Sequence, residues 1–251
     1  MRYTDEGEGL PVLFLHAFPY HRGQWEGQRA ALRGRARFLS MDARGIGADA
    51  EAPRTYMLEQ LVDDAIALLD ARGIERAVLC GCSMGGYIAL RLIERAPARV
   101  CGLLLSDTQA APDSDEAKLG RAAGLRTLAQ DGKAAFAAAQ LKRQLSASTR
   151  EEIRARLLTM IEQSSSDGIA AALVAIATRT DTRASLAKIT VPATVIVGAD
   201  DAITTPTVVR ALADEIAGAD FHVLPNAGHL PNVEAEAQFN RLLLELLARC
   251  A

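Results

Sequence analysis

One serine in this sequence lies in a pattern that can make it a nucleophile. Ser83 is the centre of Gly81-Cys82-Ser83-Met84-Gly85, between a short apolar run of strand length and an apolar run at helical spacing. A strand that becomes a helix within a few residues forces the serine into a strained backbone conformation, and the flanking glycines remove side chains that would collide there. The pattern predicts a raised hydroxyl at a helix N-terminus, where N–H groups and the helix dipole favour an oxyanion.

A serine hydroxyl is a weak nucleophile at neutral pH, so this chemistry needs a base. The sequence has four histidines. His229 lies in a loop after the last expected strand, where its imidazole could reach the serine. His222 lies inside a strand pattern, His21 in a polar loop and His16 at a strand end, which are positions typical of packed, solvated and structural histidines. We therefore expect His229 to be the base.

The base needs a carboxylate that holds its tautomer and stabilises the imidazolium. Asp200 and Asp201 follow one apolar strand pattern, and Asp107 follows another. In an open parallel sheet, ligands bind beyond the carboxyl ends of the strands, so each of these aspartates is a candidate. We prefer the adjacent pair and keep Asp107 as the alternative. The chain order serine, aspartate, histidine is the one seen for triads on this kind of sheet.

Strand and helix patterns alternate along most of the chain, and they would position these residues. Apolar runs of strand length occur at residues 12–15, 37–41, 77–80, 100–105, 193–198 and 221–224, and helical patterns at 24–32, 58–69, 205–217, 234–248 and directly after Ser83. This rhythm predicts an α/β fold, with a mostly parallel central sheet and helices on both of its faces.

The strand patterns stop between residues 111 and 188, where the sequence is rich in alanine and leucine and predicts about four helices. We expect residues 1–110 and 189–251 to form the α/β core, and 111–188 a helical cap, or lid, inserted in it. Ser148-Thr149-Arg150-Glu151 matches a capping box that would begin one of these helices. The segment also carries Arg121, Arg126, Lys142 and Arg143, any of which could bind a substrate carboxylate if it turned inward.

Composition and charge exclude several classes of function. The chain has 251 residues and a net charge of −3, and its basic residues are spread out, which argues against a nucleic-acid partner. No apolar run is long enough to cross a membrane, and no signal segment or C-x-x-C pair is seen. No H-E-x-x-H, complete P-loop or dinucleotide fingerprint occurs, so we expect no metal and no cofactor. The expected location is the cytoplasm.

Five local motifs together resemble those of the α/β-hydrolase superfamily along nearly the whole chain. They are His16-Ala17-Phe18-Pro19 for H-G-x-P, residues 42–47 for D-x-R-G-x-G, residues 81–85 for the nucleophile elbow, residues 198–201 for G-x-x-D and Gly228-His229 for G-H. The resemblance implies that Ser83 is the nucleophile, Asp201 the acid and His229 the base. It also implies an oxyanion hole made by the backbone N–H groups of Phe18 and Met84. An alanine replaces the glycine of the first motif.

Within this superfamily the sequence is similar to bacterial carboxylesterases and 3-oxoadipate enol-lactonases. The similarity implies hydrolysis of a carboxylic ester with a small or medium acyl group, through an acyl-enzyme and without a cofactor. Opening of a lactone is the alternative; it would use the same triad and needs a cation for an anionic lactone. An alternative of another class is a hydrolase-fold receptor that binds a small molecule with little turnover.

Overall fold

Seven strands form one sheet in a computed structural model that describes residues 2–47 and 55–250. The strands are β1 (Tyr3–Glu6), β2 (Pro11–Leu15), β3 (Arg37–Met41), β4 (Ala77–Cys82), β5 (Val100–Ser106), β6 (Ala193–Gly198) and β7 (Asp220–Leu224). Their order in the sheet is β1-β3-β2-β4-β5-β6-β7. β1 runs antiparallel to β3, and the other neighbouring strands pair in parallel. The predicted α/β fold with a mostly parallel sheet is confirmed.

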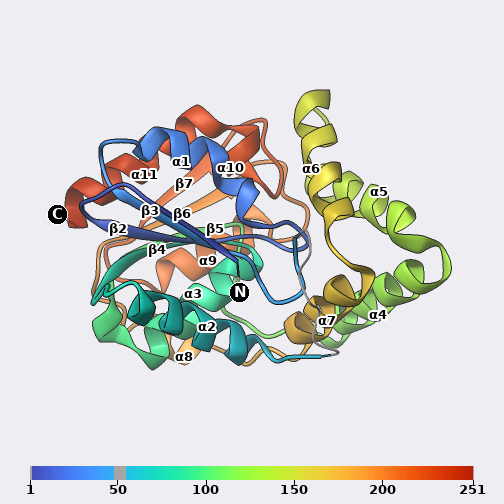
Figure 1. Ribbon diagram of the computed structural model, residues 1–251, viewed down its shortest axis with the longest axis horizontal. Helices are drawn as coiled ribbons and strands as arrows, with labels where there is room; N and C mark the ends of the chain where they lie inside the picture. Colours follow the sequence, from blue (N-terminus) through green and yellow to red (C-terminus); the bar gives the residue numbers. More distant parts are fainter. Residues whose placement is uncertain (1, 48–54, 251) are drawn as a thin grey trace.

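Helices cover both faces of this sheet (Figure 1). On one face lie α1 (Glu26–Leu32), α10 (Pro231–Glu234) and α11 (Glu236–Cys250); on the other lie α2 (Leu58–Ala71), α3 (Met84–Arg95) and α9 (Pro206–Asp214). The short 3-10 helices η1 (Arg22–Trp25) and η2 (Pro97–Arg99) precede α1 and β5. The helix predicted at residues 234–248 is α11, which begins at Glu236 because the backbone of Ala235 leaves the helical conformation after the short α10.

The central strands are buried on both faces, as their nearly continuous apolar sequences require. Every residue of β4 and β6 is buried, whereas the edge strands β1 and β7 have exposed and half-buried positions. α3 packs on β4 from one face and α11 packs on β5 and β6. Trp25 joins this core, with its ring centroid 5.1 Å from that of Phe14 and 6.1 Å from that of Phe239. The middle of the sheet is therefore a rigid base for the loops at its carboxyl end.

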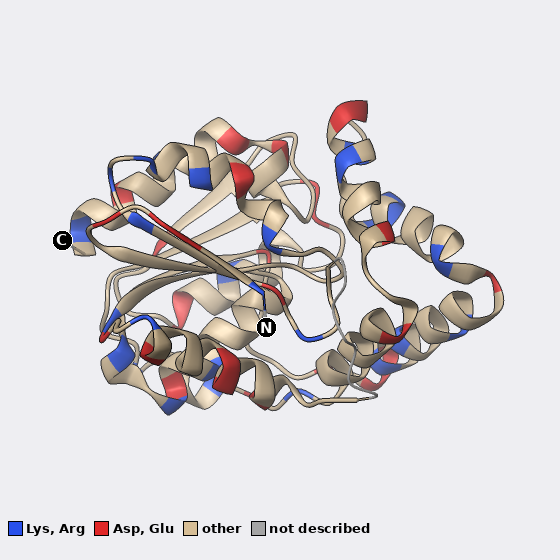
Figure 2. Cartoon of the chain, in the orientation of Figure 1, with Lys and Arg blue, Asp and Glu red and all other residues tan. Residues whose placement is uncertain are grey.

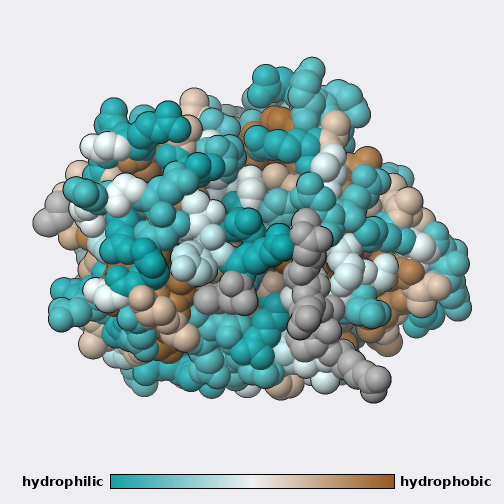
Figure 3. Space-filling model, in the orientation of Figure 1, coloured by the Kyte–Doolittle hydropathy of each residue, from teal (hydrophilic) through white to brown (hydrophobic). Residues whose placement is uncertain are grey.

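Between β5 and β6 the chain forms a group of helices that lies to one side of the sheet (green to yellow in Figure 1). They are α4 (Asp115–Gln130), α5 (Gly132–Gln144), α6 (Glu151–Gln163) and α7 (Ser166–Ala177), followed by the short α8 (Arg183–Leu186). α4 packs on α5 and α7, and α5 packs on α6. Acidic and basic residues are interspersed over these and the other helices (Figure 2), and hydrophobic side chains gather on this side of the mostly hydrophilic face in Figure 3.

The predicted capping box at the start of α6 is wrong. α6 begins at Glu151, and its first cap residue, Arg150, makes no side-chain capping bond. The Ser148 hydroxyl instead contacts Ser146 Oγ at 2.9 Å and the Asn226 carbonyl oxygen at 3.4 Å. A tertiary contact to the loop after β7 therefore occupies the side chain that the local pattern assigns to the helix.

A buried ion pair joins the two ends of the inserted helices. Asp113 lies just before α4 and Arg179 just after α7, and both side chains are almost completely buried. Arg121 of α4 also reaches Asp113, with an N–O distance of 3.1 Å. The Arg179 guanidinium lies 4.1 Å from the ring centroid of Tyr87 on α3. These contacts fix the helical segment to the helix that begins next to Ser83.

No helix in the described part of the chain is both long and apolar enough to span a membrane.

We expect Leu13→Ala to lower the free energy of unfolding by about 2–5 kcal/mol, because it leaves a cavity in the most tightly packed part of the sheet. Leu13 is 0% exposed in β2. The matched control is Leu119→Ala on α4, where the side chain is 70% exposed; we expect a change within about 0.5 kcal/mol. Urea unfolding followed by circular dichroism measures both. Equal effects of the two substitutions would contradict this assignment of the core.

Candidate active site

Ser83 occupies a sharp turn between β4 and α3. Its backbone angles are φ 51° and ψ −112°, outside the conformations that non-glycine residues normally adopt. Two tertiary hydrogen bonds hold it there: its N–H donates to the Ser106 carbonyl oxygen at 2.8 Å, and the Thr108 hydroxyl donates to its carbonyl oxygen at 2.9 Å. The strain places the Ser83 side chain at the carboxyl end of the sheet, at the N-terminus of α3.

The two glycines of the motif allow this turn because backbone atoms approach them closely. A Cβ atom on Gly85 would lie 1.8 Å from the Leu15 carbonyl oxygen, and one on Gly81 would lie 2.4 Å from the Gly85 carbonyl oxygen. Neither contact can be relieved by rotating a side chain, since the opposing atoms belong to the backbone. The packing of α3 against β4 and β2 therefore requires glycine at both positions of the motif.

Ser83, His229 and Asp201 form one chain of hydrogen bonds. Ser83 Oγ lies 2.8 Å from His229 Nε2, and His229 Nδ1 lies 2.8 Å from Asp201 Oδ2. All three residues are buried, with Ser83 9% exposed. In this arrangement Nδ1–H donates to the carboxylate and Nε2 is free to accept the serine proton. The structure thus brings together the three residues that the sequence motifs single out.

Asp201 is surrounded by hydrogen-bond donors. Its Oδ1 accepts from the N–H groups of Ile203 at 2.8 Å and Thr204 at 3.2 Å, and its Oδ2 accepts from the Thr204 hydroxyl at 2.7 Å. Burial by itself would raise the pKa of Asp201, but His229 and these donors outweigh it and hold the pKa below its usual value. Asp201 is therefore ionised at neutral pH and can stabilise an imidazolium.

Backbone contact between two loops brings Asp201 and His229 together. A Cβ atom on Gly198 would lie well under 3.0 Å from the Gly228 carbonyl oxygen, so the loop that carries Asp201 touches the loop that carries His229. Gly228 in turn lies against the Gln144 carbonyl oxygen, which accepts a hydrogen bond from the His229 N–H at 2.6 Å. Gly198 and Gly228 are therefore needed because they allow the two loops to approach this closely.

The other two candidate acids, Asp200 and Asp107, are not the hydrogen-bond partner of His229 Nδ1. Asp200 is exposed and accepts a hydrogen bond from the Ser146 hydroxyl at 2.6 Å. Asp107 is completely buried next to Asp201, but His229 Nδ1 is hydrogen-bonded to Asp201. The choice between the adjacent aspartates, which the strand pattern left open, therefore falls on Asp201.

The loop after β2 lies beside Ser83, with its backbone fixed by two glutamines. The Ala17 N–H donates to Gln24 Oε1 at 2.8 Å, and the Phe18 carbonyl oxygen accepts from Gln144 Nε2 at 3.0 Å. The N–H of Phe18 belongs to this fixed loop. Met84 is the first residue of α3, so its N–H has no partner within the helix. Both predicted oxyanion donors are thus in rigid backbone, and alanine in place of the family glycine fits the loop, where it is 0% exposed.

The remaining histidines have structural positions. His16 is buried; its Nδ1 bonds to the Ala17 carbonyl oxygen at 2.9 Å and its Nε2 accepts from the Ala43 N–H at 2.9 Å. Burial lowers the pKa of His16, so it stays neutral and links two loops. His21 accepts from the Gly23 N–H and caps η1, and His222 lies within β7.

Gln144 is a residue that the sequence patterns do not reveal. It ends α5, and its amide contacts both the Phe18 carbonyl oxygen and the Tyr20 hydroxyl, while its own carbonyl oxygen holds the His229 N–H. One residue of the inserted helices therefore joins the loop of Phe18 to the loop of His229. No local signal marks it, because a glutamine in an alanine-rich helix is unremarkable until the helix is placed against the sheet.

Asp107, Asp201 and His229 are a cluster of potential metal ligands, with ligand atoms within 4.8 Å of one another. Both nitrogens of His229 are engaged, Nδ1 by Asp201 and Nε2 by Ser83. A metal at this position would have to break the hydrogen bonds that order the centre. The cluster therefore fits proton transfer better than metal binding.

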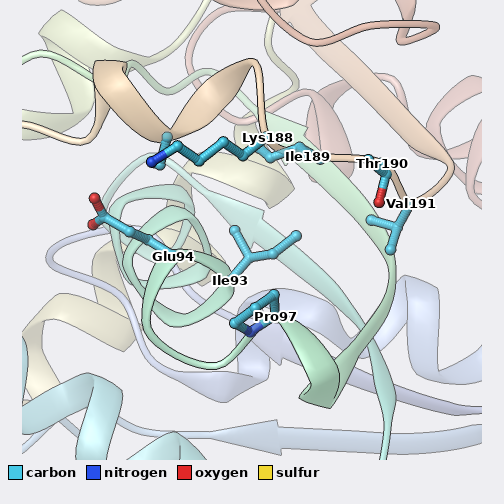
Figure 4. A pocket seen from close by; sticks show the side chains of 8 residues that line it. Ile93, Glu94, Pro97, Lys188, Ile189, Thr190 and Val191 are labelled. Atoms are coloured by element: carbon cyan, nitrogen blue, oxygen red, sulfur yellow. The ribbon is translucent and has the colours of Figure 1, made fainter.

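Two surface hollows lie away from Ser83. One is formed by Ile93, Glu94 and Pro97 near the C-terminal end of α3 and by residues 188–191 before β6 (Figure 4). Ten residues of helix separate Ile93 from Ser83, about 15 Å along the axis. The other is an apolar groove between α5 and α6, lined by Ala134, Ala138, Leu141, Leu145 and Leu158 among others. Neither is lined by a residue of the Ser83 centre.

The family is established by comparison with known proteins. The model of the alpha/beta hydrolase family matches residues 12–242. The chain therefore belongs to the alpha/beta hydrolase family, and the predicted superfamily is confirmed.

Relatives of the chain include esterases and enol-lactonases. The chain is 30% identical over 238 residues to 3-oxoadipate enol-lactonase 2 of Acinetobacter baylyi, covering 95% of this chain and 88% of that protein. It is similar to the structure of a thermophilic esterase from Thermogutta terrifontis with malate bound, at a TM-score of 0.94 and 34% identity over 99% of this chain and 93% of the other. The enol-lactonase from Burkholderia xenovorans gives a TM-score of 0.90 at 33% identity, over 98% and 96% of the two chains.

We expect Gly198→Ala to impair both hydrolysis and stability, because its Cβ would push the Asp201 loop away from the Gly228 backbone. Activity on a small activated ester should fall at least about tenfold, since small displacements of catalytic groups are costly. The matched control is Gly120→Ala in α4, where a Cβ meets no atom within 4 Å; it should keep full activity and gain up to about 1 kcal/mol of stability. Normal activity of Gly198→Ala would contradict the importance of this contact.

Proposed function

We propose that this protein hydrolyses a carboxylic ester through an acyl-enzyme, with Ser83 as nucleophile, His229 as general base and Asp201 as the acid that orients it. The observation that carries the proposal is the unbroken series of 2.8 Å hydrogen bonds from Ser83 Oγ through His229 to Asp201. The esterase and enol-lactonase names of the relatives add support.

The proposed reaction has two half-steps. Ser83 Oγ attacks the substrate carbonyl while His229 Nε2 takes its proton and then passes it to the leaving oxygen. The N–H groups of Phe18 and Met84 stabilise the oxyanion, and removing one such donor typically costs about 3–4 kcal/mol. Water activated by His229 then hydrolyses the acyl-enzyme and restores Ser83.

We further propose that residues 111–188 act as a cap over this centre, with residues 1–110 and 189–251 as the core. Gln144 of α5 touches the Phe18 carbonyl oxygen and the His229 N–H, so this helix lies directly beside the reacting groups. Phe136, two turns earlier on α5, packs edge-on against Phe18 at 6.1 Å between ring centroids. The inner side of α5 is therefore placed to form a wall of the acyl or alcohol site.

One lid cation favours a substrate that carries its own carboxylate. Arg143 adjoins Gln144 on α5, and its one hydrogen bond is a 3.5 Å contact to the Gln140 amide; no carboxylate pairs with it among the described residues. Arg143 is exposed to solvent; partial desolvation and the nearby Arg121 lower the pKa of its guanidinium, and Asp201 is close enough to oppose this shift. An anionic ester or lactone is therefore a candidate substrate, with lactone opening as the second function.

We expect Ser83→Ala to reduce hydrolysis of p-nitrophenyl acetate by about 10⁴-fold or more while the circular dichroism spectrum stays unchanged. Ser166→Ala, at an exposed position in α7, is the control and should keep wild-type turnover. Sustained product release by the wild type supports an enzyme. A single slow acylation with little release would identify a receptor, and full turnover by Ser83→Ala would refute the assignment of the nucleophile.

We expect Arg143→Gln to raise KM for anionic substrates about tenfold to a hundredfold and to change neutral substrates little, because a charge-assisted hydrogen bond contributes about 1.5–3 kcal/mol. The panel pairs p-nitrophenyl esters of graded length with esters and lactones that carry a free carboxylate. Lys142→Gln is the control, since Lys142 lines the groove between α5 and α6. Equal losses on neutral and anionic substrates would exclude the carboxylate-binding role, and activity on lactones alone would reverse the order of the two functions.

A further inference from the structure

A second buried carboxyl group lies behind the catalytic histidine and has no part in the proposed reaction. Asp107 follows β5 with its backbone in the left-handed region, at φ 49°, and its side chain is 0% exposed. Its Oδ1 accepts from the Gly198 N–H at 2.9 Å and its Oδ2 from the Ser106 hydroxyl at 2.5 Å. Its N–H donates to the Ile196 carbonyl oxygen at 3.0 Å. The group is thus held between β5 and β6 and aimed at the acid of the triad.

Asp107 and Asp201 are both buried, and their carboxyl groups lie within 4.8 Å of each other. Two ionised carboxylates at this distance in a buried site repel each other strongly. A proton on one of the two removes this repulsion and provides a donor for a hydrogen bond between them. The titratable groups that face Asp107 from the surrounding elements of the described chain are Asp201, His229 and the Cys82 thiol. This set includes no lysine or arginine that would compensate a negative charge on Asp107.

The two environments determine which carboxyl holds the proton. Asp201 accepts hydrogen bonds from two N–H groups, the Thr204 hydroxyl and His229 Nδ1. Asp107 accepts from one N–H group and one hydroxyl and is completely buried. Because more hydrogen-bond donors surround Asp201, a negative charge is more stable on Asp201 than on Asp107. In agreement, burial and the charge of Asp201 raise the pKa of Asp107 well above its usual value.

We propose that Asp107 stays protonated at neutral pH and donates a hydrogen bond to Asp201, so that it acts as a positioning residue for the acid of the triad. The inference rests on the triad proposed above. The donated bond adds to those from Ile203 and Thr204 in fixing the Asp201 carboxylate. A neutral Asp107 also limits the buried charge beside His229 to one carboxylate, because a second would make the imidazolium too stable to return its proton to the leaving group.

The first test compares a variant that can still donate with one that cannot. The amide of Asp107→Asn can donate to Asp201 and accept from Gly198, so kcat should stay within about threefold of wild type and the acid side of the kcat/KM profile should not move. Asp107→Ala removes the donor, and kcat should fall at least about tenfold. A shift of the acid-side inflection of Asp107→Asn to lower pH by one unit or more would overturn the proposal, because that is the effect of removing a negative charge. Equal losses in the two variants would also overturn it.

The second test observes the proton without turnover. The infrared spectrum of the wild type at pH 7 should contain a C=O stretch of a protonated carboxylic acid, which disappears in Asp107→Asn and persists in Ser83→Ala. If Asp107→Asn does not fold, labelling with [4-¹³C]aspartate shifts the band and assigns it to an aspartic acid in the unmutated protein. Absence of the band in an active enzyme would refute the proposal and leave the triad standing. The band in a protein that hydrolyses no ester would instead count against the proposed function alone.

Discussion

Close backbone contact at the carboxyl end of the sheet is the constraint on which the candidate site depends. The carbonyl oxygen of Leu15 occupies the space that a Cβ would need on Gly85, and the carbonyl oxygen of Gly228 does the same at Gly198. The first contact holds the turn at Ser83 in a conformation that a non-glycine residue rarely adopts. The second holds the loops of the acid and the base together. Because these contacts join backbone to backbone, no rotation of a side chain can relax the geometry.

The charge of Asp201 is stabilised by His229 and by hydrogen-bond donors around it. Asp201 is ionised in a buried position because main-chain N–H groups, a hydroxyl and His229 donate to it. Desolvation makes each of these bonds stronger than it would be in water, and it also makes any unpaired charge costly. Gln144 extends the same network to the inserted helices, since it contacts the Phe18 loop and the His229 loop at once. The position of α5 and the geometry around Ser83 and His229 are therefore coupled through the side-chain amide and the backbone carbonyl of Gln144.

Much of the fold could be predicted from the sequence, because the spacing of apolar residues along a segment determines whether it forms a buried strand or a helix. The strand at 37–41 and the strand at 193–198 have the predicted bounds, and four long helices fill the inserted segment as expected. The predictions failed or stayed open where the role of a side chain depends on a contact with a residue far away in the sequence. Ser148 forms a loop contact instead of capping α6, and neither the contacts of Gln144 nor the position of Asp107 beside Asp201 has a local signature.

The sequence by itself determined the family, the order of the strands along the chain and the identity of a serine, an acidic pair and a histidine at strand ends. Those features follow from residue types and short spacings, which act through the local backbone. Only the tertiary structure decided that Asp107 lies beside Asp201 and His229 and that, among the residues the structure describes, Arg143 of α5 has no carboxylate partner. These outcomes depend on how loops far apart in the chain pack against one another, and the free energy of that packing is a property of the whole sheet rather than of any single segment.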